Sequence, residues 1–159
     1  MAGATTPITG GCLCGTVRYE ANEPPIETGT CHCRMCQKWT GSAFMVMARF
    51  SRTALRFTEG EPKLYRSSSI KEKGFCSNCG SSLFDRYLVP KAENSQFHPD
   101  MVWVQVGTLD VPEAVSIDWH YGVESQLPWV HFDDGLPSER SDEDPELAAA
   151  FSAAEVGEE

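Results

Sequence analysis

Seven cysteines are the residues of this sequence best suited to chemistry, and all of them lie between Cys12 and Cys79. Two cysteines separated by one residue point to the same side of an extended strand, so both sulfurs can reach one ion. Two cysteines separated by two residues have the turn spacing that places a pair of thiolates about a tetrahedral zinc ion. Both spacings occur, in the clusters Cys12-Leu-Cys14, Cys31-His-Cys33-Arg-Met-Cys36 and Cys76-Ser-Asn-Cys79.

These clusters predict metal sites rather than disulfides, because an odd cysteine set does not complete a disulfide framework. Cys31, Cys33 and Cys36 lie within six residues, so spacing favours one site of three thiolates with a position left open, as in catalytic zinc. Such a thiolate-rich site suits a further soft ligand such as a thiol. The other cysteines would form a closed site typical of structural zinc: Cys12, Cys14, Cys76 and Cys79.

Two other interpretations of the cysteines stay open. They could be buried core residues without a metal, or both metals could be structural, with a histidine completing the three-cysteine site. On a strand, His32 would point away from the ion of its neighbours Cys31 and Cys33. Three more distant histidines could fold back: His98, His120 and His131. Of these, His120 is also the best candidate for an acid–base role near neutral pH.

Short β-strands must position these clusters, because short apolar runs punctuated by Gly and Pro fill the sequence before residue 138. The clearest run, residues 101–106, places Val102, Val104 and Val106 on one face. The other predicted strands are 16–20, 43–50, 64–66, 82–84 and 116–119, and a helical turn or two is expected at 34–39. The predicted fold class is therefore mainly β.

The net charge of −10 is concentrated at the end of the chain. Residues 138–159 contain eight acidic residues and one basic residue, Arg140, with few large apolar side chains. This composition predicts one folded domain over residues 1–137, followed by a flexible acidic tail over residues 138–159. The tail would be disordered or contain one short helix around residues 145–154.

Composition and charge also exclude some partners and locations. A net charge of −10 makes the chain a poor candidate for binding a phosphate backbone. No stretch approaches the roughly 18 to 20 apolar residues of a membrane span, and the first residues lack the features of a secretory signal. We therefore expect no nucleic-acid partner, no membrane association and a cytoplasmic location. The sequence does not indicate the oligomeric state.

The cysteine clusters lie in three longer motifs: Gly10-Gly-Cys-Leu-Cys-Gly-Thr-Val-Arg-Tyr19, Cys31-His-Cys-Arg-Met-Cys-Gln-Lys-Trp-Thr-Gly41 and Gly74-Phe-Cys-Ser-Asn-Cys-Gly-Ser-Ser-Leu83. Over about residues 8–137, the chain resembles the glutathione-dependent formaldehyde-activating enzyme family, also called the centromere-protein-V/Gfa domain. The resemblance implies a β-tent fold of short antiparallel sheets around two zinc ions per chain. It implies a catalytic zinc at Cys31, Cys33 and Cys36, and a structural zinc at Cys12, Cys14, Cys76 and Cys79.

The activity that the resemblance implies is that of a carbon–sulfur lyase of the S-hydroxymethylglutathione synthase type, which serves formaldehyde detoxification. The partners would be a small-molecule thiol and an aldehyde, with glutathione as the co-substrate. Glutathione carries two carboxylates, so its pocket should offer cations, and we expect Arg34 and Lys38 to bind it. Arg49 and Arg52 are further candidates near the three-cysteine cluster. The alternative function is a non-catalytic zinc-binding module that mediates protein interaction.

Overall fold

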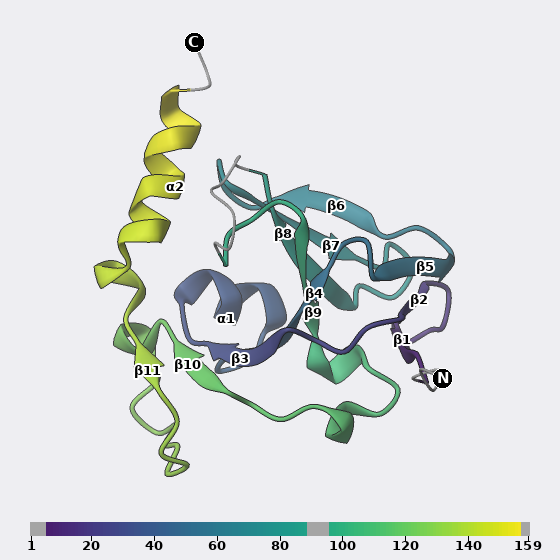
Figure 1. Cartoon of the computed structure of the whole chain (residues 1–159), viewed down its shortest axis with the longest axis horizontal. Helices are drawn as coiled ribbons and strands as arrows, with labels where there is room; N and C mark the ends of the chain where they lie inside the picture. The colour runs from purple at the N-terminus through teal and green to yellow at the C-terminus, as the bar shows by residue number, and fades with distance from the viewer. Residues whose placement is uncertain (1–5, 89–95, 157–159) are drawn as a thin grey trace, which may run out of the picture.

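An eight-stranded sheet and a three-stranded sheet form most of the protein (Figure 1). The computed structural model describes residues 6–88 and 96–156. The small sheet has the order β1-β2-β5, with β1 (Ile8–Gly11), β2 (Arg18–Ala21) and β5 (Leu55–Glu59). The large sheet has the order β11-β10-β3-β4-β9-β8-β7-β6. Its strands are β3 (Glu27–Cys31), β4 (Met45–Ser51), β6 (Lys63–Arg66), β7 (Lys71–Phe75), β8 (Ser82–Tyr87), β9 (Met101–Gln105), β10 (Trp119–Tyr121) and β11 (Ser138–Glu139).

Short helices accompany these strands. Helix α1 (Arg34–Thr40) lies between β3 and β4, and helix α2 (Pro145–Val156) follows β11. Four 3₁₀ helices complete the described elements: η1 (Val106–Thr108), η2 (Pro112–Ala114), η3 (Val123–Ser125) and η4 (Ser141–Glu143). Across residues 6–88 and 96–156, no helix combines the length and the apolar character needed to cross a membrane. The mainly β fold predicted from the sequence is confirmed.

Each face of the large sheet has its own core. The central strands β4 and β9 are largely buried, and successive side chains of a strand point to opposite faces. Phe50 and Val104 pack in the first core, together with Tyr19 of the small sheet. Met47 and Trp103 pack in the second core. The two halves of the cysteine set follow this division, because Cys12 and Cys76 belong to the first core and Cys31 and Cys36 to the second.

Helix α1 begins at a cysteine and ends at a glycine. Cys33 has an extended backbone, and its sulfur accepts a hydrogen bond from the Cys36 N–H at 3.5 Å, which caps the first turn. Gly41 adopts a left-handed conformation with φ of 68°, and its N–H donates to the carbonyl of Gln37 at 2.9 Å. The helix covers the turn or two predicted at residues 34–39. Its cap therefore also fixes two cysteines of the second cluster.

Residues 138–156, which belong to the predicted acidic tail, lie against the folded body. β11 pairs in parallel with β10, and the Tyr121 hydroxyl donates a hydrogen bond to Asp144 at 2.6 Å. In α2, Ala150 is fully buried in the second core, and Leu147 and Ala154 pack against that core. These three residues share one helix face because they are spaced by three and four positions. The structure thus holds this segment in place, and residues 157–159 lie outside the described residues.

Candidate metal centres and the adjoining cavity

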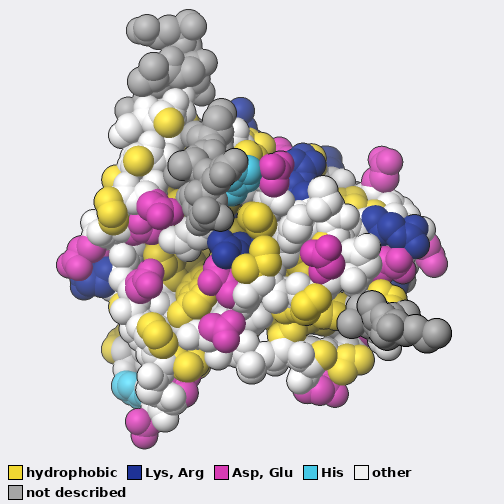
Figure 2. Space-filling model, in the orientation of Figure 1, with side chains coloured by type: hydrophobic (Ala, Val, Ile, Leu, Met, Phe, Trp, Pro, Cys, Tyr) yellow, Lys and Arg dark blue, Asp and Glu magenta, His cyan; other side chains and the backbone are white. Residues whose placement is uncertain are grey.

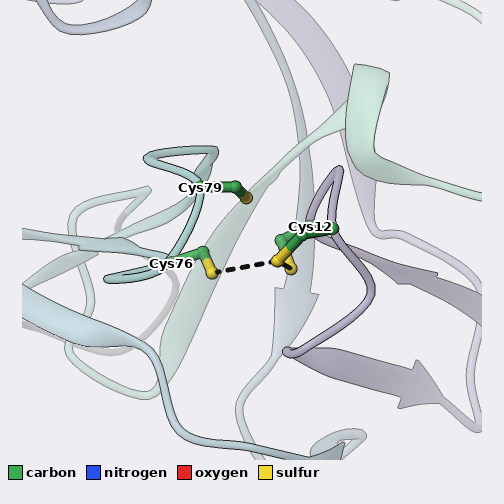
Figure 3. Close-up of side chains that lie close together, drawn as sticks. Cys12, Cys76 and Cys79 are labelled. Carbon is green, nitrogen blue, oxygen red and sulfur yellow. Dashed lines mark hydrogen bonds between the residues drawn. The ribbon is translucent and has the colours of Figure 1, made fainter.

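Four cysteines from two loops face one another at the edge of the first core. Cys12 and Cys14 lie in the turn between β1 and β2, and Cys76 and Cys79 lie in the turn between β7 and β8. Figure 3 shows Cys12 pointing toward Cys76 and Cys79 across the gap between the two turns. Their four sulfurs lie within 4.8 Å of one another. Gly80, with φ of 77°, closes the second turn by donating its N–H to the Cys76 carbonyl at 2.8 Å. This four-cysteine group therefore joins the small sheet to the large one.

The spacing of these sulfurs fits a tetrahedral metal ion. The Cys12 and Cys14 sulfurs are 3.5 Å apart, and the Cys14 and Cys76 sulfurs are 3.8 Å apart. Ligands about 2.3 Å from a tetrahedral zinc are separated by about 3.8 Å, whereas disulfide sulfurs are about 2.05 Å apart. All seven cysteines are free. The donor set and its spacing thus fit a zinc ion. The four cysteines would need only small shifts to bind it.

Hydrogen bonds favour the thiolate at two members of the four-cysteine group, Cys14 and Cys79, whereas at Cys76 the backbone bond with Cys79 is outweighed, chiefly by burial, and the pKa rises to about 11. Bonds from Thr16 and then Asn78 lower the pKa of Cys14 to about 5. A bond from the Ser81 side chain lowers the pKa of Cys79 to about 7. The backbone N–H of Val17 donates to the Cys12 sulfur at 3.2 Å. Because a metal binds the thiolate rather than the thiol, these donors prepare the sulfurs for a cation.

The other three cysteines meet on the opposite face of the large sheet. Cys31 ends β3, Cys33 caps α1 and Cys36 lies in the first turn of α1. Their sulfurs lie within 4.8 Å of one another. Hydrogen bonds from the Cys31 and Cys36 thiols lower the pKa of Cys33 to about 2. The bond with Cys31 favours the Cys36 thiolate, but the bond with Cys33 and burial outweigh it and raise the pKa of Cys36 to about 12.

These pKa values describe three sulfurs that share negative charge, which is carried mainly by the Cys33 thiolate. A group of three soft donors fits a thiophilic metal such as zinc and leaves a tetrahedral ion one position short of a closed shell. Within the described residues, no histidine and no carboxylate joins either cysteine group at ligand distance. The structure therefore gives no support to a histidine that completes the three-cysteine site.

A cavity of about 110 Å³ opens beside the three-cysteine group, and all three of its cysteines line it. Its walls are mostly apolar and aromatic. They come from β4, β7, β8, β9 and β10, from residues outside these strands such as Ile70 and Phe97, and from α2. The aromatic residues of the lining are Tyr87, Phe97, Trp103, Trp119, Tyr121 and Phe151. Cysteine sulfurs at the wall of an apolar cavity are screened from water and can meet a small molecule there.

Lys71 is the one cationic side chain among the described residues that line this cavity. Its ammonium lies 3.0 Å from Asp85 Oδ2 and 4.8 Å from the centre of the Tyr87 ring. Lys73 donates to the same Asp85 oxygen at 2.6 Å, and both Asp85 and Lys73 are fully buried. Burial opposes the charge of Lys71, but Asp85, together with Tyr87 and the neighbouring cysteines, outweighs burial and holds the pKa of Lys71 well above its usual value. The cavity therefore contains one fixed ammonium.

Lys71 and Asp85 were not among the residues singled out from the sequence. Their strands pair with Lys73 opposite Asp85 and Lys71 opposite Tyr87. The available signal was the spacing Lys71-Glu-Lys73, which puts two lysines on one face of a strand. An acidic residue inside the hydrophobic run of β8 was the matching signal.

Arg34 and Lys38, expected to bind glutathione, do not line the cavity of the three cysteines. They are exposed on α1 and line a separate shallow hollow with Leu127 and Trp129. The reason is helical geometry, because Arg34 and Lys38 are four residues apart and share the outer face, while Cys36 faces the core. Of the other cations considered, Arg49 pairs with Glu27 at 3.2 Å, and Arg52 bonds the Pro99 carbonyl.

His120 also lies away from the cysteines, in a buried polar chain on the other side of β3 and β10. Its Nδ1 lies 2.7 Å from the Thr30 hydroxyl, and its Nε2 lies 3.0 Å from Asp134. The Thr30 hydroxyl also lies 3.1 Å from Nε2 of His32. Thr30 pairs with His120, whereas Cys31 pairs with Tyr121, so the two sets of side chains point to opposite faces. His120 is therefore a buried, hydrogen-bonded histidine and lines no part of the cavity.

Comparisons with known proteins agree with this arrangement. The profile of a family described as glutathione-dependent formaldehyde-activating enzyme matches residues 7–124. A protein of Schizosaccharomyces pombe, described as an uncharacterized lyase, is 35% identical over 109 residues, which cover 69% of this chain and 77% of that protein. A crystal structure of a Rhodobacter sphaeroides protein covers 82% of this chain and 98% of its own, with 19% identity and a TM-score of 0.50. That likeness concerns the fold alone.

Proposed function

The chain belongs to the glutathione-dependent formaldehyde-activating enzyme family, and we propose on this premise that it is a zinc-dependent carbon–sulfur lyase. Its substrate would be the adduct of a thiol, such as glutathione, with an aldehyde, and S-hydroxymethylglutathione is the simplest example. The observation that carries the proposal is the meeting of Cys31, Cys33 and Cys36 at one wall of the apolar cavity. Three thiols without a fourth protein ligand are suited to a reaction, whereas the four-cysteine group is suited to a structural role.

Zinc held by Cys31, Cys33 and Cys36 would supply a Lewis acid with affinity for the thiol of the substrate. The second zinc would be held by Cys12, Cys14, Cys76 and Cys79, where it links the two sheets. The fit of zinc to both sites rests on the sulfur donors and on the spacing between them. The proposed location is the cytoplasm, because all seven cysteines are free and free cysteine clusters persist in reducing compartments.

The chain's own residues bind and orient the adduct. In cleavage, the carbon–sulfur bond breaks and its electron pair stays on sulfur. The hydroxyl proton passes to the departing thiolate, so that a thiol and an aldehyde leave. We assign to Lys71 a hydrogen bond to the oxygen of the adduct, where negative charge develops as the proton leaves. Asp85 holds the Lys71 ammonium in place, and the aromatic walls exclude water that would screen this contact.

The proposal is tested by exchange NMR of glutathione and formaldehyde with and without the purified protein. Metal analysis of the same sample should find two zinc ions per chain. The expected result is exchange between free thiol and adduct faster than the spontaneous reaction, in proportion to protein concentration. A protein with both metals that accelerates no thiol–aldehyde exchange would contradict the lyase assignment and favour the non-catalytic zinc module.

A further inference from the structure

We infer that the preferred aldehyde carries an uncharged apolar substituent of about four carbon atoms, and that α2 forms part of its binding wall. This inference rests on the proposed lyase function and names the substrate class of the same site. A cavity of about 150 Å³ accommodates benzene. The cavity beside the three cysteines, at about 110 Å³, therefore has room for a group smaller than benzene, such as a short alkyl chain.

The walls of the cavity favour an apolar group. The cavity lining also contains Met47, Ile70, Phe97 and Trp103, and all four belong to the second core. The hydroxymethyl group that formaldehyde adds to a thiol has two heavy atoms, and it would leave most of these walls without a contact. Only a larger substituent would make dispersion contacts with these walls and remove their apolar surface from water.

Helix α2 contributes two apolar side chains to the same cavity. Leu147 and Phe151 line it, and Ala150 between them is fully buried and holds the helix on the core. Phe151 keeps 38% of its surface exposed, so a ligand in the cavity would cover an aromatic ring that the protein alone leaves open. Figure 1 shows α2, in yellow, rising from β11. These residues lie outside residues 7–124, which the family profile matches. Specificity for the substituent would thus come from a segment beyond the shared domain.

Charge at the entrance disfavours an anionic substituent. A wider hollow of about 420 Å³ adjoins the cavity and shares Gln96, Trp119 and Tyr121 with it. This hollow carries four carboxylates and a single guanidinium, from Glu27, Glu139, Asp144, Glu146 and Arg49. Figure 2 shows acidic side chains bordering apolar surface in the region below α2. Like charges in this hollow would repel an aldehyde that bears a carboxylate, and the Lys71 ammonium inside the cavity is already paired with Asp85, so an uncharged aldehyde avoids the repulsion.

The test compares three aldehydes with glutathione as the common thiol, using the metal-loaded protein and the exchange NMR assay. Formaldehyde lacks a substituent, pentanal has an apolar one and glyoxylate has an anionic one. We expect kcat/KM for pentanal to exceed the other two values at least about tenfold, the scale on which apolar pockets discriminate. Phe151→Ala should lower the ratio of pentanal to formaldehyde activity about tenfold. Ser152→Ala, an exposed neighbour on the same helix, should leave the ratio unchanged.

A binding measurement gives a readout that does not depend on turnover. Trp103 and Trp119 line the cavity, so titration with 1-pentanol should change tryptophan fluorescence to saturation, and Phe151→Ala should weaken this binding. Equal kcat/KM values for formaldehyde and pentanal, or no saturable fluorescence change, would overturn the inference while leaving the lyase function intact. Failure to accelerate exchange with any of the three aldehydes would overturn the proposed function, and the substrate class with it.

Discussion

The ammonium of Lys71 lies 3.0 Å from the carboxylate of Asp85, and this buried pair puts one positive charge beside three thiols in an otherwise apolar cavity. Lys73 bonds the same carboxylate oxygen at 2.6 Å. Asp85 is thus able to keep a partner if Lys71 is replaced. This redundancy makes it possible to remove the charge in the cavity without leaving an unpaired carboxylate in the core, which would cost about 3–5 kcal/mol.

Lys71→Met should therefore reduce activity more than stability. Loss of a hydrogen-bond donor aimed at a developing negative charge lowers kcat by about 100-fold in comparable sites. Turnover in the exchange assay and a thermal melt of the same sample check this expectation. Lys63→Met, on the exposed edge strand β6, is the matched control and should change neither. A Lys71→Met protein with the turnover of the unmodified chain would remove Lys71 from the mechanism.

Gly122→Ala should disturb the three-cysteine site. Gly122 has φ of 70°, and a Cβ added there would lie 3.0 Å from the Cys33 backbone nitrogen. Gly135 has the same φ of 70° but no neighbour within 4 Å of such a Cβ, so Gly135→Ala reports the backbone strain alone. We expect both variants to lose about 1 kcal/mol or more of unfolding free energy. Only Gly122→Ala should also weaken metal binding at the three-cysteine site, measured by competition with a chelator. Equal metal affinity in both variants would show that Gly122 does not position Cys33.

The fold should lose stability at alkaline pH through Tyr19. Burial raises the pKa of its phenol to about 12, against a hydrogen bond with Thr108 that lowers it. The raised pKa means that the neutral phenol contributes fully below pH 10, the usual value for tyrosine. This contribution is lost as pH rises from 10 to 12, because the unfolded chain ionises first. Urea unfolding across this range should show a shallower loss of free energy for Tyr19→Phe. Parallel curves would assign the alkaline loss to other groups.

The sequence predicted the parts of this structure that depend on local spacing. The division of the cysteines into four and three matches the two groups whose sulfurs meet, because each pair is set by its own strand or turn. The runs that became β4 and β9 were visible as apolar segments. Metal binding and catalysis at these groups stay predictions.

The features of the fold and of the site that were not predicted from the sequence depend on tertiary contacts. Strand β3 contains Gly29, which weakens any strand prediction, yet a Cβ there would lie 2.4 Å from the ring of Trp119. Strand β7 looks like a charged surface strand, but its lysines are buried around Asp85 on the next strand. Arg34 and Lys38 are close to the cysteines along the chain and face away from the cavity in space. Each case depends on a partner that is distant in sequence.

Cys79→Ser should show that the metal at the four-cysteine group is structural rather than reactive. Because a structural zinc supplies folding free energy, loss of one ligand from the four-cysteine group should unfold the domain or lower its melting temperature strongly. Far-UV circular dichroism during heating measures this effect. Ser81→Ala, which removes a hydroxyl that lies 3.2 Å from the Cys79 sulfur and accepts from the Leu13 N–H but leaves the four sulfurs intact, should have a much smaller effect. A Cys79→Ser protein as stable as the Ser81→Ala protein would argue against a structural metal there.

The central claim is that Cys31, Cys33 and Cys36 form the reactive centre, and Cys33→Ser tests it most directly. The measurement is the rate of thiol–adduct exchange per folded chain, on a sample whose metal content is determined at the same time. The account predicts that Cys33→Ser retains the fold and one zinc per chain, and that its exchange rate falls to the spontaneous rate. A folded Cys33→Ser protein that binds one zinc and exchanges thiol as fast as the unmodified chain would contradict the account.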